Sequence, residues 1–156
     1  MNNPGYSYSE LEAYASKFYQ GRPLLLTPYS YVLTFTGLAA AATATQTLSI
    51  AANADFIFTN LHYHANVANA AQTVGNKTIA LARLLITDSG SNEQFSSAAV
   101  DLENYATNAW FQNPVEYPRI VSGRSTLTVQ LTNYDAAATY NIDLAFTGVL
   151  VRAYTA

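Results

Sequence analysis

The sequence contains no cysteine, and this absence excludes several ways of stabilising or using a protein. Disulfide bonds, thiolate metal ligands and a nucleophilic cysteine are all ruled out for this chain. Its 156 residues must therefore be held together by a hydrophobic core. A chain of this length can bury a sufficient core as one domain.

Charged residues are also scarce, at 11% of the chain against roughly 25% in an ordinary soluble domain. The net charge is −3, and the seven Lys and Arg residues are scattered along the chain. Because no basic stripe is present, nucleic acid is not an expected partner. A surface rich in Thr, Asn, Ala and Tyr is typical of a protein that lies against other protein surfaces.

Long apolar runs are missing as well. The longest purely apolar run, residues 38–42, is much shorter than a membrane span. The first residues lack the basic and apolar regions of a signal peptide. We therefore expect no membrane partner and no export.

A strict alternation of apolar and polar residues is the clearest pattern that is present. In residues 125–133, Leu127, Val129 and Leu131 alternate with polar residues, which predicts a strand with one buried and one wet face. The alternation resumes in residues 140–152 and changes phase after Gly148. A phase change at a glycine predicts a bulge or bend in this last strand.

Further strands are expected along most of the chain after residue 23. Pro28 breaks the first of them, which favours an edge strand or a bend. Residues 93–107 fit either a short strand or a helix. Seven to nine short strands without crossover helices predict an all-β antiparallel sandwich or barrel, best fitted by a jelly roll of about eight strands in two sheets. The additional strands are expected at residues 24–36, 45–52, 55–65, 78–87 and 119–121.

One helix is expected, at residues 6–20, capped by Ser9 with Glu12 three residues later. We divide the chain into this helix or arm, residues 1–22, and a β domain, residues 23–156. The helix either packs on its own domain or docks as an arm on a neighbouring protein. In the second alternative, its candidate contact residues are Tyr6, Tyr8, Leu11, Tyr14, Phe18 and Tyr19.

His62 and His64 are the best lead for a metal site, because residues two apart on a strand project from the same face. A cupin-like site would need further ligands, and the chain has no third histidine. We regard the pair as weak candidate ligands and predict no cofactor. Surface or interface histidines are the alternative interpretation.

Trp110 and Phe111 are adjacent aromatic residues in an irregular stretch. They are candidates for the core, for a protein contact or for a platform that stacks on sugar rings. No nucleophile elbow, phosphate loop or marked carboxylate pair accompanies them. The sequence therefore predicts a protein that is not an enzyme.

The strand pattern of the C-terminal half resembles small jelly-roll virion proteins of tailed bacteriophages. The resemblance is carried by a proline-led short strand and glycine turn in residues 118–124, by the Leu-x-Val-x-Leu-x-Asn strand in 125–133, and by the Phe-x-Gly ending of 140–148. Residues 47–58, where an acidic residue precedes an aromatic one, are similar to an earlier strand pair of these proteins.

The resemblance implies a capsid decoration (cement) protein. Such a protein would be made in the host cytoplasm and would lie on the capsid surface of the virion. Its expected partner is the major capsid protein or another virion subunit, and its expected state is a homotrimer. Cement contacts are distributed over a surface, so no functional residue is carried over. A cupin-like metal-binding protein and a carbohydrate-binding jelly roll remain the alternatives.

Overall fold

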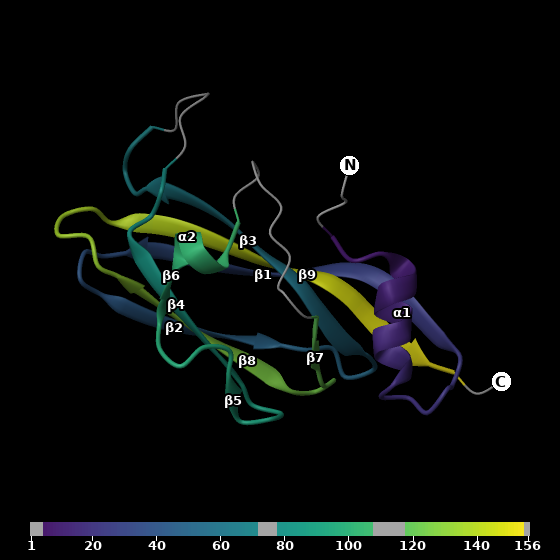
Figure 1. The fold of residues 1–156 in the computed structure, drawn as a ribbon. Helices are drawn as coiled ribbons and strands as arrows, with labels where there is room; N and C mark the ends of the chain where they lie inside the picture. Colours follow the sequence, from purple (N-terminus) through teal and green to yellow (C-terminus); the bar gives the residue numbers. More distant parts are fainter. Residues whose placement is uncertain (1–4, 72–77, 108–117, 155–156) are drawn as a thin grey trace.

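The strands of this protein pair in a nested order, the first with the last and the second with the next to last. The computed structural model describes residues 5–71, 78–107 and 118–154. Its four-stranded sheet has the order β1 (Leu24–Leu38), β9 (Tyr140–Ala153), β3 (Asp55–Val67) and β7 (Arg119–Val121) (Figure 1). The five-stranded sheet has the order β2 (Thr43–Ser49), β8 (Thr126–Asn133), β4 (Ala82–Asp88) and β5 (Glu93–Gln94), and β6 (Val100–Asp101) also pairs with β4.

The nesting continues inward, since β3 pairs with β7 and β4 with β5. With β6 set aside as an addition beside β4, eight strands in this order form a jelly roll. The predicted antiparallel sandwich is confirmed. Its core lies between the two sheets and is built largely from phenylalanine, leucine and isoleucine side chains that are almost fully buried, among them Phe35, Phe56, Phe58, Phe146, Leu127, Leu131, Ile142 and Leu144.

Strand β8 has the predicted alternation: Leu127, Val129 and Leu131 are buried, and the residues between them are half-exposed. It lies between β2 and β4, so both of its edges are paired. The ambiguous segment 93–107 contains both kinds of element, because β5 and β6 are followed by the short helix α2 (Leu102–Tyr105).

Pro28 lies on an edge strand, as the sequence indicates, because β1 is the outermost strand of its sheet. The backbone N–H of Tyr154 in the chain after β9 donates to the carbonyl of Pro23 at 3.1 Å. Backbone groups alternate in direction along a strand, so the even-numbered residues of β1, Pro28 included, face the open edge. The missing N–H of Pro28 therefore costs no hydrogen bond of the sheet.

Helix α1 (Tyr8–Ser16) is shorter at both ends than the predicted helix of residues 6–20. Its cap is Ser7, not Ser9: the Glu10 N–H donates to Ser7 Oγ at 3.2 Å, and the Ser7 N–H donates to Glu10 Oε2 at 2.7 Å. The sequence contains Ser-x-x-Glu in both frames, and the hydrogen bonds of the folded chain select the first. No helix among the described residues has the length and apolar character to cross a bilayer.

The predicted bulge in the last strand is wrong. Strand β9 keeps an unbroken register with β1 on both sides of Gly148, and the irregularity lies in β3, where Thr59 is the extra residue. Val149 and Val151 point to the outer face of the sheet, where helix α1 covers them. The apolar pattern changes because the outer face becomes buried there, and not because the strand changes phase.

Candidate functional site

Helix α1 lies against the outer face of the four-stranded sheet, at the end where β1 begins and β9 ends (Figure 1). Its Leu11 and Ala15 are one helical turn apart and are both buried. They pack in a second, smaller core with side chains of β1, β3 and β9, namely Leu24, Leu26, Ile57, Val149 and Val151. In this structure the helix therefore packs on its own domain, the first of the two alternatives.

A polar contact fastens the end of this segment to the sheet. The Tyr19 hydroxyl donates to the carboxylate of Asp55 at the start of β3. The Gly123 N–H, in the turn before β8, donates to the other carboxylate oxygen at 2.7 Å. Partial burial and the hydrogen bond to Asp55 raise the pKa of Tyr19 above its ordinary value. Asp55 thus ties three segments together that are far apart in the sequence.

We expect Tyr19→Phe to lower the free energy of unfolding by about 1–2 kcal/mol, because it removes one hydrogen bond to a carboxylate. A tyrosine with a raised folded pKa contributes stability below its unfolded pKa of about 10, and loses that contribution as the pH rises further. The difference between wild type and variant should therefore shrink between about pH 8 and about pH 11. Urea unfolding of wild type and Tyr19→Phe at both pH values measures this difference in the free energy of unfolding. A difference that does not change with pH contradicts this role of Tyr19.

Exposed aromatic residues flank the buried face of α1 at its two ends. Tyr8 is 55% exposed and Phe18, just after the helix, is 52% exposed. The rings of Tyr14 and Phe18 meet edge to face with centroids 5.2 Å apart. The two rings form one wall of a groove of about 530 Å³, whose other walls come from the β4–β5 turn and from the segment around β7, with Asp88, Gly90, Ser91, Glu93, Pro118, Arg119, Ile120 and Ser122.

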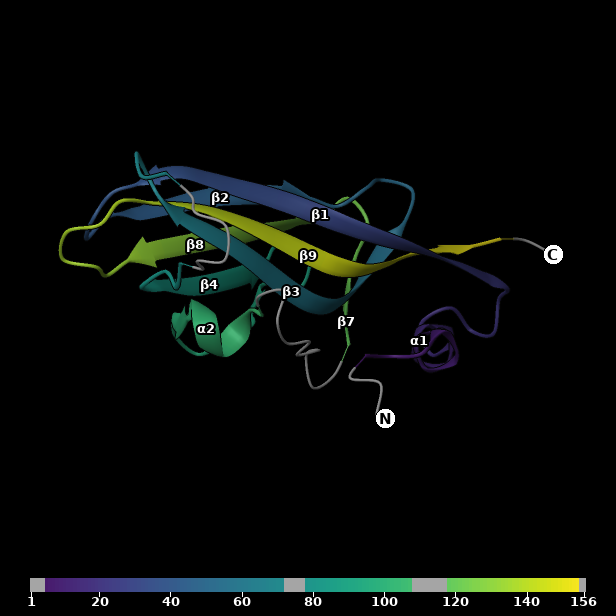
Figure 2. The same cartoon turned by 90° about the horizontal axis from the view of Figure 1, so that it is seen from above.

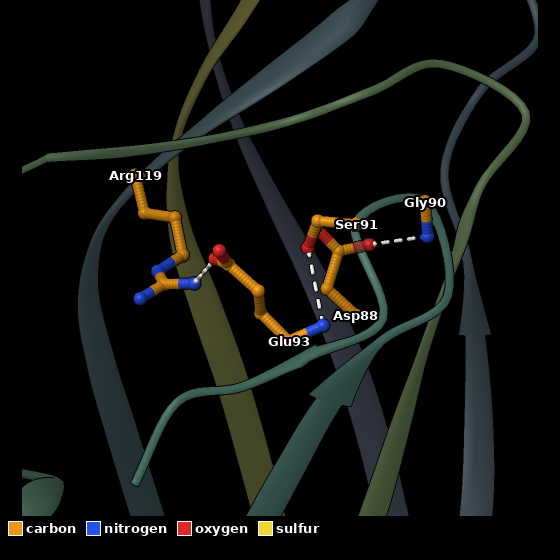
Figure 3. Close-up of polar contacts among 5 residues, drawn as sticks. All are labelled: Asp88, Gly90, Ser91, Glu93 and Arg119. Atoms are coloured by element: carbon orange, nitrogen blue, oxygen red, sulfur yellow. Dashed lines mark hydrogen bonds and ion pairs between the residues drawn. The ribbon is translucent and has the colours of Figure 1, made fainter.

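The polar wall of this groove is built from hydrogen bonds and an ion pair (Figure 3). Asp88 accepts hydrogen bonds from the Gly90 N–H at 2.8 Å and the Ser91 hydroxyl at 3.1 Å, which shapes the β4–β5 turn. Arg119 of β7 reaches across to Glu93 with 3.3 Å between Nη1 and Oε2. The groove therefore has a hydrogen-bonded polar rim beside an apolar, aromatic wall. Such a site is suited to binding.

His62 and His64 project from one face of β3, as predicted; this is the outer face of the four-stranded sheet, and His64 stands opposite Asp143 of β9. His62 Nδ1 lies 3.1 Å from the Thr107 hydroxyl, and partial burial lowers the pKa of His62. His62 also lines a hollow of about 210 Å³ with Leu11 and Tyr6. Within residues 5–71, 78–107 and 118–154, no three His, Cys, Asp or Glu side chains are placed to share a metal ion.

The structure thus divides the predicted contact residues of the N-terminal segment. Leu11 is buried between the helix and the sheet, and Tyr6, Tyr14 and Tyr19 pack against the same cluster. Tyr8 and Phe18 remain exposed, with Tyr14 between these extremes. Trp110 and Phe111 lie outside the described residues.

Sequence reasoning missed the opposite wall of the groove, which pairs Arg119 with Glu93 across 26 positions of the chain. It also missed the exposed Leu25 and Tyr29 in β1. The available signal was that β1 is predicted to be much longer than β2, which leaves part of one sheet without a facing sheet.

Comparison with known proteins adds nothing to this geometry, because no protein-family model, curated protein or solved structure matches the chain. The jelly-roll assignment depends on the order of the strands alone. Any function has to be argued from the surfaces described above.

Proposed function

We propose that this chain is a non-enzymatic structural protein of a tailed-bacteriophage virion, a decoration or cement protein that binds the assembled major capsid protein as a homotrimer. The observation that carries the proposal is the aromatic surface of the α1 segment beside the groove of about 530 Å³. We name this surface, made of Tyr14, Phe18 and the groove, the helix surface.

Exposed aromatic residues that gather in one place are typical of protein contacts. Tyr and Phe are enriched in the cores of interfaces, where one well-packed ring can supply much of the binding energy. The rings of Tyr14 and Phe18 already hold each other in place, so less side-chain freedom is lost on binding. A partner that inserts apolar side chains into the groove would bury the rings against Pro118 and Ile120.

The composition supports attachment to an extended protein array. With 11% charged residues, the chain relies little on long-range electrostatics for solubility. Stable contacts between proteins bury about 800 Å² on each partner, which is more than a single groove provides. A jelly roll offers such an area on either broad face, and the strand pattern resembles that of small virion proteins. The proposed location is therefore the capsid surface.

Phe18→Ser tests the helix surface. Because Phe18 is exposed and covers none of the core, we expect the variant to fold normally and to bind capsids ~30-fold more weakly, as for loss of one central aromatic contact. The measurement is co-sedimentation with heads of the encoding phage assembled without this protein. Val32→Ser is the matched control: Val32 is 60% exposed but lies about 20 Å along β1 from the part that α1 covers.

Wild-type protein that stays in the supernatant at all concentrations contradicts the proposed function. Equal binding by the Phe18 and Val32 variants leaves attachment in place but excludes the helix surface as its site.

The groove also fits a carbohydrate, which is the second candidate. An aromatic pair beside an arginine, carboxylates and serine hydroxyls is the combination that recognises a sugar ring. Calorimetric titration with a panel of bacterial surface oligosaccharides separates the two candidates. A sugar site predicts saturable binding that Tyr14→Ala abolishes, while no heat with any glycan excludes it.

A further inference from the structure

One end of the four-stranded sheet extends past the other sheet. The first residues of β1 and the last of β9 pair with each other beyond β7 and the five-stranded sheet (Figure 2). Helix α1 covers the outer face of this extension. Its inner face is the continuation of the core face of β1, and here Leu25 and Tyr154 are 45% and 48% exposed. Tyr29 lies on the same face at the base of the extension, level with β7, and is 46% exposed. We name this surface the overhang.

The overhang carries positive charge. Arg152 is the cross-strand neighbour of Leu25 and is partly exposed on the same face. Arg22 lies just before β1 and is exposed. The two ion pairs found in the described parts of the chain involve Arg83 and Arg119. Arg152 and Arg22 therefore have no carboxylate partner among the described residues.

A second apolar patch lies on the five-stranded sheet, beside α2. Ile79, Leu81 and Tyr134 are 58%, 41% and 42% exposed, and they border a hollow of about 220 Å³ that Asp101 and Glu103 also line. We name this surface the acidic hollow.

The charges of the acidic hollow are only partly compensated. The guanidinium carbon of Arg83 lies 4.9 Å from the centre of the Tyr134 ring. The Nε atom of Arg83 is 3.8 Å from Oδ1 of Asp101. Glu103 has no cation within ion-pair distance among the described residues. The hollow therefore keeps a negative charge next to its exposed apolar side chains.

We propose that the overhang of one copy of this chain docks into the acidic hollow of the next copy. The two surfaces hold six of the nine exposed large apolar side chains found in the described residues, and their charges are opposite. An apolar cavity of roughly 150 Å³ admits a benzene molecule, so the hollow has room for the ring of Tyr29 or Tyr154. The inference deepens the proposed function, because it rests on the proposed self-assembly and names the contact between copies.

The charges also decide the symmetry of this contact. Two overhangs placed against each other bring arginine against arginine, and two hollows bring glutamate against glutamate, so contacts between like patches are disfavoured. Each copy instead uses one surface to dock and the other to receive. Such a head-to-tail contact closes into a ring when the rotation between copies permits, as a trimer requires.

A charge reversal tests the contact. We expect Arg152→Glu and Glu103→Arg each to weaken self-association at least tenfold, because each places like charges across the contact. The double variant Arg152→Glu/Glu103→Arg restores the opposite charges with the wild-type net charge, and should associate like wild type. The measurement is sedimentation velocity over a range of protein concentrations at low salt, with circular dichroism to show that each variant is folded.

Two further variants keep the test decisive. Glu12→Arg makes the same charge change as Glu103→Arg on exposed α1, and should leave the association constant unchanged. Tyr29→Ser changes no charge and should weaken association at least tenfold.

A wild-type protein that remains monomeric at every concentration overturns the inference, as does a folded double variant that fails to recover. If the double variant associates like wild type but wild-type protein does not bind capsids, the contact between copies stands and the proposed function is wrong.

Discussion

Gly148→Ala is expected to lower the free energy of unfolding by about 3 kcal/mol or more, one of the largest effects of any single methyl group in this chain. A Cβ at Gly148 would lie 1.8 Å from the carbonyl oxygen of Ile57 and 3.2 Å from the ring of Phe56. The obstacle is the backbone of the neighbouring strand, so β3 and β9 have to separate at the bulge. A fall of roughly 1 M or more in the urea midpoint measures the loss.

Gly37→Ala is the control for this prediction. Gly37 has a φ of +67°, and a Cβ there would meet nothing within 4 Å. The alanine therefore pays only the backbone strain of a left-handed conformation, about 1 kcal/mol. If both variants lose the same stability, close contact between the strands is not the reason for the glycine at position 148.

Asn133→Asp is the second substitution for which we expect a large loss, about 3 kcal/mol at neutral pH. Asn133 ends β8 and is fully buried. Its amide donates to the carbonyls of Leu38 at 3.0 Å and Ala138 at 2.8 Å, while its oxygen accepts from the Asp135 N–H at 2.9 Å. Aspartate lacks both donors and would hold a buried charge against two carbonyl oxygens.

The loss should depend on pH in a definite direction. Burial and the facing carbonyls raise the folded pKa of the new carboxyl above its unfolded value of about 3.9. The folded variant then binds a proton more tightly than the unfolded chain, so its deficit against wild type is smallest near and below about pH 4 and grows as the pH rises. Urea unfolding of both proteins at matched pH values measures this difference.

Asn141→Asp is the matched control. Within the described parts of the chain, Asn141 uses only its side-chain oxygen, which accepts from the Gly37 N–H at 2.8 Å, and a carboxylate keeps that bond. We expect a change within about 0.5 kcal/mol. A deficit equal to that of Asn133→Asp contradicts the role of the two donated hydrogen bonds.

Local patterns were sufficient to predict most of the strands. The alternation around Leu127, Val129 and Leu131 survives folding because β8 has one face on the core and one toward solvent. The proline at position 28 indicates an edge strand, since proline has no N–H to donate to a neighbouring strand, and β1 is an edge strand. These are properties of a residue and its immediate neighbours, which the sequence contains in full.

The candidate site was predicted less well. The aromatic residues of the N-terminal segment are visible in the sequence, but their division into buried Leu11 and exposed Tyr8 and Phe18 is not. That division depends on where α1 docks, and the docking depends on apolar residues of β1, β3 and β9. The same contact explains the pattern around Val149 and Val151, which resembles a phase change when the helix is ignored.

The sequence by itself determined the class of the fold, an antiparallel sandwich, and the presence of a capped helix before it. Only the tertiary structure decided which faces are covered: α1 on the outer face of the four-stranded sheet, an uncovered inner face at the overhang, and an acidic hollow beside α2. The physical reason is that alternation records the two faces of a strand locally. Whether a face is buried depends on elements distant in the chain and on the relative lengths of the two sheets.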